Sequence, residues 1–144
     1  VGLAICLRDK NYLGKGLEIW KKYRTEILEQ INKWRNEVKD SFCMRYLVME
    51  NAPSTSPIAS TLSRYIYADK PLIVVNIKNG KAKVSARSNA KLAEKVDLAE
   101  VMRLAAERVG GRGGGHKVAA GANIEPQAVE EFLREVDRLC CMQS

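Results

Sequence analysis

The stretch LIVVNIKNGKAKVSAR, from Leu72 to Arg87, decides the fold. Two runs with the composition of β-strands, 72–77 and 81–87, flank Asn79-Gly80, and both of these residues tolerate the positive φ that a tight turn requires. In the second run, small apolar residues alternate with the polar residues Lys81, Lys83, Ser85 and Arg87. Because alternate side chains of a strand share a face, the stretch predicts a β-hairpin with one basic, polar face.

Helices and further strands are expected on both sides of this hairpin. Residues 1–7 and 42–50 have the apolar and β-branched composition of strands. Apolar residues three and four apart predict a long amphipathic helix over 17–39, in which Trp20 and Trp34 pack against a partner surface. Shorter helices are predicted after Ser56 as N-cap with Pro57 at the first position, over 97–109 with Asp97 as N-cap, and from Pro126 onwards.

Together these elements predict an α/β fold with a small central sheet that contains the hairpin, flanked by helices and preceded by a long amphipathic helical arm. The length of 144 residues fits one domain with a helical extension. We expect residues 1–41 to form the N-terminal strand and helical arm, a connector or insertion region, and residues 42–144 to form the domain proper.

Composition narrows the class of protein. The chain is 46% hydrophobic and 28% charged, as is typical of an ordered domain. No apolar run approaches the roughly 20 residues that span a bilayer, and no signal peptide is recognisable, so we expect a cytoplasmic protein with no membrane partner. The first residue is Val1 rather than Met, which suggests a piece of a longer protein.

The four cysteines (Cys6, Cys43, Cys140 and Cys141) do not have the CxxC spacing of a zinc site. We therefore interpret them as reduced thiols.

Positive charge is concentrated in one segment. Between Lys78 and Lys117, ten Lys and Arg stand against four Asp and Glu, whereas two Arg stand against five acids from Glu125 onwards. Such a segment attracts phosphates, although a solvated basic face without a ligand has the same composition. A phosphate is also the obvious ligand for the glycine-rich run 110–115, which we expect to be a loop whose bare amides converge on an anion. The alternative is a helix C-cap followed by a mobile loop.

Two motifs in this segment carry a resemblance to a known family. The run Gly113-Gly114-Gly115-His116-Lys117-Val118-Ala119-Ala120-Gly121-Ala122, preceded by Lys83-Val84-Ser85-Ala86-Arg87-Ser88, resembles the DHH-associated domain. That domain occurs C-terminally in DHH family phosphoesterases, which include RecJ-like nucleases, oligoribonuclease phosphoesterases and cyclic-dinucleotide phosphodiesterases. The similarity covers roughly residues 44–139 and is greatest to archaeal RecJ-like single-strand-specific exonucleases of the GINS-associated nuclease type.

The resemblance implies a substrate-binding domain that grips single-stranded DNA or RNA, or a small nucleotide, while its own DHH domain, absent from this sequence, hydrolyses it with two Mn or Mg ions. It implies no catalytic residue, no metal and no cofactor in this chain, which alone should be inactive. A GINS-type replication factor is a possible protein partner, and the alternative function is a module that docks such a factor. The substrate-binding residues implied are Ser85, Arg87, Ser88, Gly113, Gly114, Gly115, His116 and Lys117.

Overall fold

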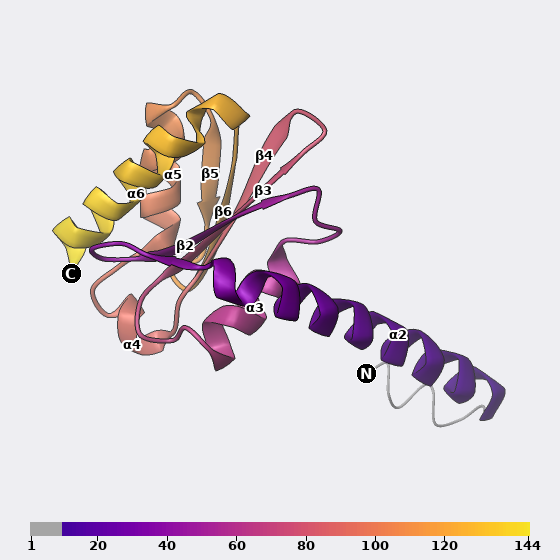
Figure 1. Ribbon diagram of the computed structural model, residues 1–144. Helices are drawn as coiled ribbons and strands as arrows, with labels where there is room; N and C mark the ends of the chain where they lie inside the picture. Colours follow the sequence, from indigo (N-terminus) through magenta and orange to yellow (C-terminus); the bar gives the residue numbers. More distant parts are fainter. Residues whose placement is uncertain (1–9) are drawn as a thin grey trace.

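The computed structural model describes residues 10–144 and contains a six-stranded sheet with helices on both faces (Figure 1). The strand order is β1-β2-β3-β4-β6-β5, and only β2 and β3 are parallel. The strands are β1 (Lys39–Asp40), β2 (Arg45–Glu50), β3 (Leu72–Lys78), β4 (Lys81–Arg87), β5 (Arg112–Gly115) and β6 (Ala119–Ile124). The mixed α/β architecture is therefore confirmed. The strand predicted over residues 1–7 lies outside the described residues.

The predicted hairpin forms the centre of the sheet. Strands β3 and β4 pair with Val75 opposite Val84, and the turn is at Asn79 and Gly80 as predicted; both of these residues have positive φ. Apolar side chains from β3, β4 and β6 pack under α5 (Leu98–Arg108) and α6 (Val129–Gln143), with Phe132 fully buried among them. The short elements α4 (Ala90–Ala93) and η2 (Pro126–Ala128) precede these two helices.

Asp97 caps α5 as predicted. Its carboxylate accepts hydrogen bonds from the amides of Ala99 and Glu100 at 3.0 and 3.4 Å. The amide of Asp97 itself donates to the side chain of Gln143, at the C-terminal end of α6. The last turn of α6 and the first turn of α5 are therefore held together.

The opposite face of the sheet is covered over β2, β3 and part of β4. There α3 (Ser56–Tyr65) buries Ile58 and Leu62 against apolar side chains of both strands. The long helix α2 (Lys10–Trp34) contributes Ile31, near its C-terminal end, to the same cluster, and its N-terminal part projects away from the sheet (Figure 1). It begins and ends earlier than the predicted 17–39. Its end at Trp34 is followed by η1 (Arg35–Glu37) and β1. None of the described helices combines the length and apolar composition needed to cross a membrane.

Four residues of the glycine-rich run form a strand, so the predicted loop over 110–116 is wrong for residues 112–115. Gly110, which has a positive φ, lies in the turn that ends α5. Residues 112–115 form β5, which pairs with β6 at the edge of the sheet. A Cβ added at Gly113 would collide with the carbonyl of Met102 on α5, and one at Gly111 would lie 2.5 Å from the carbonyl oxygen of Asn123. Glycine is therefore required here for close packing of backbone against backbone, although it is a poor strand former by propensity.

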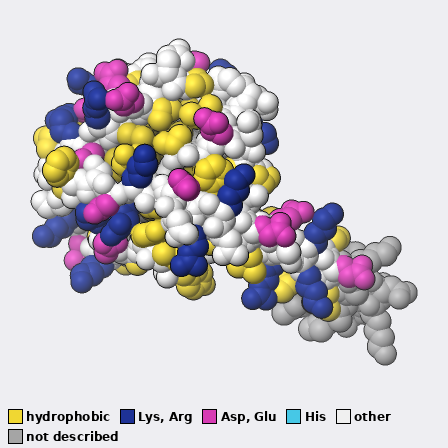
Figure 2. Space-filling view, in the orientation of Figure 1, with side chains coloured by type: hydrophobic (Ala, Val, Ile, Leu, Met, Phe, Trp, Pro, Cys, Tyr) yellow, Lys and Arg dark blue, Asp and Glu magenta, His cyan; other side chains and the backbone are white. Residues whose placement is uncertain are grey.

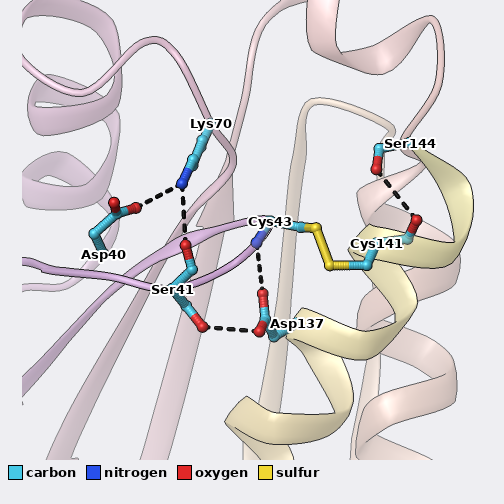
Figure 3. Close-up of a disulfide and its surroundings, with 7 residues drawn as sticks. All are labelled: Asp40, Ser41, Cys43, Lys70, Asp137, Cys141 and Ser144. Carbon is cyan, nitrogen blue, oxygen red and sulfur yellow. Dashed lines mark hydrogen bonds and ion pairs between the residues drawn. A yellow bond between two sulfur atoms is a disulfide. The ribbon is translucent and has the colours of Figure 1, made fainter.

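A disulfide joins Cys43 to Cys141, so the prediction of reduced thiols is wrong for this pair (Figure 3). The turn before β2 meets the last turns of α6, which brings the two Cα atoms to 5.3 Å, within bridging range. The Asp137 carboxylate accepts hydrogen bonds from the Cys43 amide and the Ser41 hydroxyl, both at 2.8 Å. Cys140 remains a buried free thiol, and burial raises its pKa to about 12, which keeps it from attacking the bridge as a thiolate.

Candidate functional site

The uncovered half of the sheet holds a cavity beside α3. Because α3 packs on β2 and β3 and reaches only part of β4, the same face of β6, β5 and the rest of β4 remains open. The cavity has a volume of about 280 Å³ and is lined by side chains of β4, glycines of β5 and β6, and Ser56 of α3. Its polar residues include Lys83, Ser85 and Arg87, the basic face predicted from the alternation of β4.

Arg87 is the cation at the end of this cavity. Its Nε donates to the Ser60 hydroxyl at 3.0 Å, and its Nη1 donates to the carbonyl oxygens of Ala86 and Ala120 at 2.8 and 3.2 Å. Burial lowers the pKa of the guanidinium from its usual range, because the charged form is partly removed from water. Within residues 10–144, Arg87 forms no ion pair and its Nη2 forms no hydrogen bond. The remaining donors are therefore available to an anion.

Two serines beside Arg87 extend the polar lining. The hydroxyl of Ser85 is buried and lies 3.2 Å from that of Ser56. We expected Ser56 to cap α3, but Thr55 precedes the helix and no side chain caps it, so the capping prediction is wrong. Ser88 lines an adjoining cavity, and its buried hydroxyl has no hydrogen-bond partner in the described part of the chain. A buried hydroxyl without a partner is uncommon in folded proteins.

The structure separates the glycines of the predicted site. Gly114 and Gly115 line the cavity, and a Cβ added at Gly114 would meet nothing within 4 Å. Gly113 faces α5 instead. Since His116 and Ala119 form a hydrogen-bonded pair and such pairs alternate along an antiparallel ladder, the amides of Gly113 and Gly115 point outward from the sheet edge. These edge amides do not converge as the predicted loop amides would have done.

His116 and Lys117 lie in the exposed turn between β5 and β6 and do not line the cavity. The turn is close to Arg87 nevertheless, because Ala119 at its end is the register partner of Arg87 in β4. The amide of Ser88 donates to the Val118 carbonyl, and that of Leu98 donates to the Lys117 carbonyl. The turn is thus anchored both to the Arg87 strand and to the start of α5.

The sequence interpretation missed the contribution of α3 to this site. Ser56 and Ser60 are four residues apart and so lie on one face of the helix, where they contact Ser85 and Arg87. Their spacing was visible in the sequence, but nothing indicated that this face lies over β4. Asn123 of β6 also lines the cavity and was not predicted.

One group of metal-ligating side chains occurs among residues 10–144, and it lies away from this cavity. It consists of Cys43, Asp137 and Cys141, whose ligand atoms lie within 4.8 Å of one another. The two sulfur atoms are bonded to each other, and the carboxylate is engaged by Ser41 and Cys43, so this group is not arranged to hold an ion.

Comparison with known proteins identifies relatives of this fold. The DHHA1 domain family matches residues 42–141. An uncharacterized protein of Methanocaldococcus jannaschii is 30% identical over 139 residues, which are 96% of this chain and 31% of that protein. The chain therefore spans about a third of the curated relative that it matches.

Solved structures of other proteins share the fold. RecJ from Thermus thermophilus, in complex with Mn²⁺, superimposes with a TM-score of 0.67 and 22% identity, over 92% of this chain and 19% of RecJ. The C-Ala domain of alanyl-tRNA synthetase from Aquifex aeolicus has a TM-score of 0.62 and 18% identity, over 72% of this chain and 96% of that domain.

Proposed function

Because this chain belongs to the DHHA1 domain family, we propose that it is the substrate-binding part of a DHH phosphoesterase similar to the archaeal RecJ-like exonucleases. In this proposal, residues 42–144 form the substrate-binding domain, and residues 1–41 connect it to the rest of the protein. The ligand is the phosphate backbone of single-stranded DNA or RNA, or a small nucleotide. The similarity of the fold to RecJ and to the C-Ala domain supports this proposal.

The observation that carries the proposal is that the Arg87 guanidinium is partly buried and has no carboxylate partner among residues 10–144. A partly desolvated guanidinium without a carboxylate partner is costly, and a bidentate phosphate would satisfy its free donors. Ser85 in β4 and Ser88, which follows Arg87, would contribute their hydroxyl groups to phosphate binding. Gly113, Gly114 and Gly115 would bring the sheet edge close to an adjacent phosphate, which the outward amides of Gly113 and Gly115 would hold together with His116 and Lys117 in the neighbouring turn.

Hydrolysis belongs to a part of the protein outside this sequence. Two-metal hydrolysis needs clustered acidic and imidazole ligands, and this chain contains one histidine. We propose that a DHH domain supplies two Mn or Mg ions, in line with the Mn²⁺ bound by Thermus RecJ. This chain would then position the phosphate and would not turn over substrate by itself.

Replacement of Arg87 by glutamine tests the proposal. We expect the affinity of this chain for an eight-nucleotide single strand, oligo(dT) or oligo(rU), to fall by about 10- to 150-fold, because a charge-assisted hydrogen bond contributes roughly 1.5–3 kcal/mol. The affinity can be measured by fluorescence anisotropy at two salt concentrations. The matched control is Arg103→Gln on α5, where the guanidinium pairs with Glu107 on the opposite side of the sheet. Equal affinities of the wild type and Arg87→Gln, or losses of the same size in both variants, would contradict the proposal.

A second candidate function, docking of a GINS-type replication factor, is favoured by the surface of α2. Large apolar side chains are exposed along this helix: Leu17, Ile19, Trp20, Tyr23 and Leu28. Figure 2 shows hydrophobic and basic side chains interspersed on the projecting helix. Trp20 is 55% exposed, and the Arg24 guanidinium lies 5.5 Å from its ring centroid. Exposed aromatic side chains beside arginine are typical of interaction hot spots.

Replacement of Trp20 by alanine separates this second function from the first. We expect capture of a purified GINS complex to fall at least about ten-fold, as for a hot-spot residue, while the affinity for single strands stays unchanged. Trp34 is unsuitable for this test because it packs against the α3 cluster, so its loss would disturb the fold. Thr25→Ala, at an exposed position on the same helix, is the control. Unchanged capture by Trp20→Ala in a pull-down would exclude this helix as the docking surface.

A further inference from the structure

The Arg87 cavity is the middle of a longer depression beside α3. It shares Ser56 and Lys83 with a cavity of about 450 Å³ at the β3–β4 turn. It shares Arg87 and Ala119 with a cavity of about 440 Å³ at the other end of α3. We call these three contiguous cavities the α3 groove. The groove runs from the turn at Asn79 and Gly80 to the region of Ser88.

The charge of the α3 groove has one sign. Among the described residues that line it, five are cationic and none is Asp or Glu; the cations are Arg64, Lys78, Lys81, Lys83 and Arg87. Another cavity, beside α6, is different, since Glu130, Arg134 and Asp137 all contribute to it. A groove with cations alone raises the local concentration of anions.

The hairpin places these cations in a row. Lys81, Lys83, Ser85 and Arg87 alternate along β4 and therefore share its open face, and Lys78 is the register partner of Lys81. The distance from Lys81 to Arg87, six residues along a strand, is roughly 20 Å. A stacked nucleic-acid strand places a phosphate about every 3.4 Å along its axis, so the row is long enough for several phosphates.

Within residues 10–144, Lys78 and Lys83 form no ion pair. Lys81 is 3.7 Å from Glu125, and both side chains are largely exposed, so that pair is weak. Ser54 and Ser56 supply hydroxyls beside the lysines, and Ser60 and Ser88 do so beyond Arg87. Hydroxyls beside unpaired cations suit a chain of phosphodiesters better than a single compact anion.

We propose that the α3 groove binds a single-stranded polynucleotide along its length, with a distal phosphate subsite formed by Lys78 and Lys83 beyond the Arg87 subsite. This inference rests on the proposed function and adds the class of substrate: a strand of several nucleotides rather than a mononucleotide or dinucleotide. Lys78 lies outside the glycine and arginine motifs that define the Arg87 subsite, and Lys83 lies at the start of the arginine motif, where the two cavities meet. These lysines bind the strand at a point some distance along the groove from the phosphate that Arg87 contacts.

The test compares two ligands with a double variant of this chain. Lys78→Gln with Lys83→Gln removes both distal cations, and Lys91→Gln with Lys95→Gln, at exposed positions outside the groove, removes the same charge. The ligands are an eight-nucleotide oligo(dT) and a 5′-phosphorylated dinucleotide, titrated at salt concentrations from about 0.1 to 1 M and followed by amide chemical shifts. All four replaced lysines are exposed, so both variants should fold.

For single strands, each lost phosphate contact reduces the slope of log affinity against log salt by about 0.7. We therefore expect the slope for the octanucleotide to fall by about 1.4 in the Lys78/Lys83 variant. If the variant and the wild type bind equally near 1 M salt, this change in slope corresponds to about 25-fold weaker binding at 0.1 M salt. The slope for the dinucleotide should fall by no more than about 0.7, because Lys83 also lines the Arg87 cavity whereas Lys78 does not. The Lys91/Lys95 control should bind both ligands as the wild type does.

The other outcomes overturn the inference in distinguishable ways. If Arg87→Gln weakens the octanucleotide but the Lys78/Lys83 variant does not, the distal subsite is wrong and the proposed function stands. If the dinucleotide is weakened as much as the octanucleotide, the lysines belong to the Arg87 subsite. Equal losses in the Lys91/Lys95 control would show a general charge effect. If neither the Arg87 variant nor the Lys78/Lys83 variant loses affinity, both proposals fail.

Discussion

Replacing Gly113 by alanine should destabilise the protein by about 3 kcal/mol, at the upper end of the usual cost of overpacking. The added Cβ would collide with the backbone carbonyl of Met102 and lie 3.2 Å from the Cβ of Ala106, both in α5. Neither the helix backbone nor the edge strand can yield without losing contacts in the core below α5. The free energy of unfolding, measured by urea denaturation, reports the effect.

Gly114→Ala is the matched control for this substitution. A Cβ at Gly114 would meet nothing within 4 Å, so the stability should change by less than about 1 kcal/mol. The new methyl group would instead enter the cavity that contains Arg87. Affinity for a single strand should therefore fall in Gly114→Ala, although the fold is preserved. Equal destabilisation by the two substitutions would contradict the packing argument.

Reduction of the Cys43–Cys141 disulfide should lower the free energy of unfolding by roughly 4 kcal/mol. The bridge closes a loop with a sequence separation of 98 residues, and a loop of that length restricts the unfolded chain strongly. The hydrogen bonds from Ser41 and Cys43 to Asp137 do not depend on the bridge, so the reduced protein should keep its fold. Urea unfolding with and without a phosphine reductant measures the difference.

A double variant, Cys43→Ser with Cys141→Ser, is the control for reduction. It should resemble the reduced protein, and reductant should not change its stability. Mass spectrometry of tryptic peptides establishes whether residues 43 and 141 are linked before the measurement. A linked protein whose unfolding midpoint does not shift on reduction would refute the stabilising role of the bridge.

The core of the fold was predictable because local signals and tertiary contacts agree there. Asn79-Gly80 predicts the turn and the alternation around Val84 predicts which side chains share a face, and both are found in β3 and β4. Asp97 is another local signal, since an N-cap contacts amides only two and three residues away. Such features need no knowledge of the rest of the chain.

The failures all depend on contacts between distant segments. Gly113 was assigned to a loop because its conformational freedom is visible in the sequence, whereas its packing on Met102 is not. Likewise, Cys43 and Cys141 show no spacing motif because the fold alone brings them together. Ser56 looked like a cap, yet its hydroxyl contacts Ser85 in a strand 29 residues away.

The same distinction applies to the candidate site. Lys83, Ser85 and Arg87 were expected to share a face, and they do so in the cavity. The exposed position of His116, outside the cavity, could not be predicted, because it depends on the length and pairing of β5. The positions of the site residues in a strand could therefore be predicted from the sequence, whereas those of the residues in the turn could not.

Both edges of the sheet end in very short strands, and this affects the behaviour of the protein at high concentration. One edge is β1, two residues that are both charged, and the other is β5, four residues that begin with Arg112 and are otherwise glycine. A long, flat and apolar edge would be a template for strands of other molecules, and neither edge offers one. The domain can therefore keep one face of its sheet uncovered beside α3 without recruiting further copies into an extended sheet.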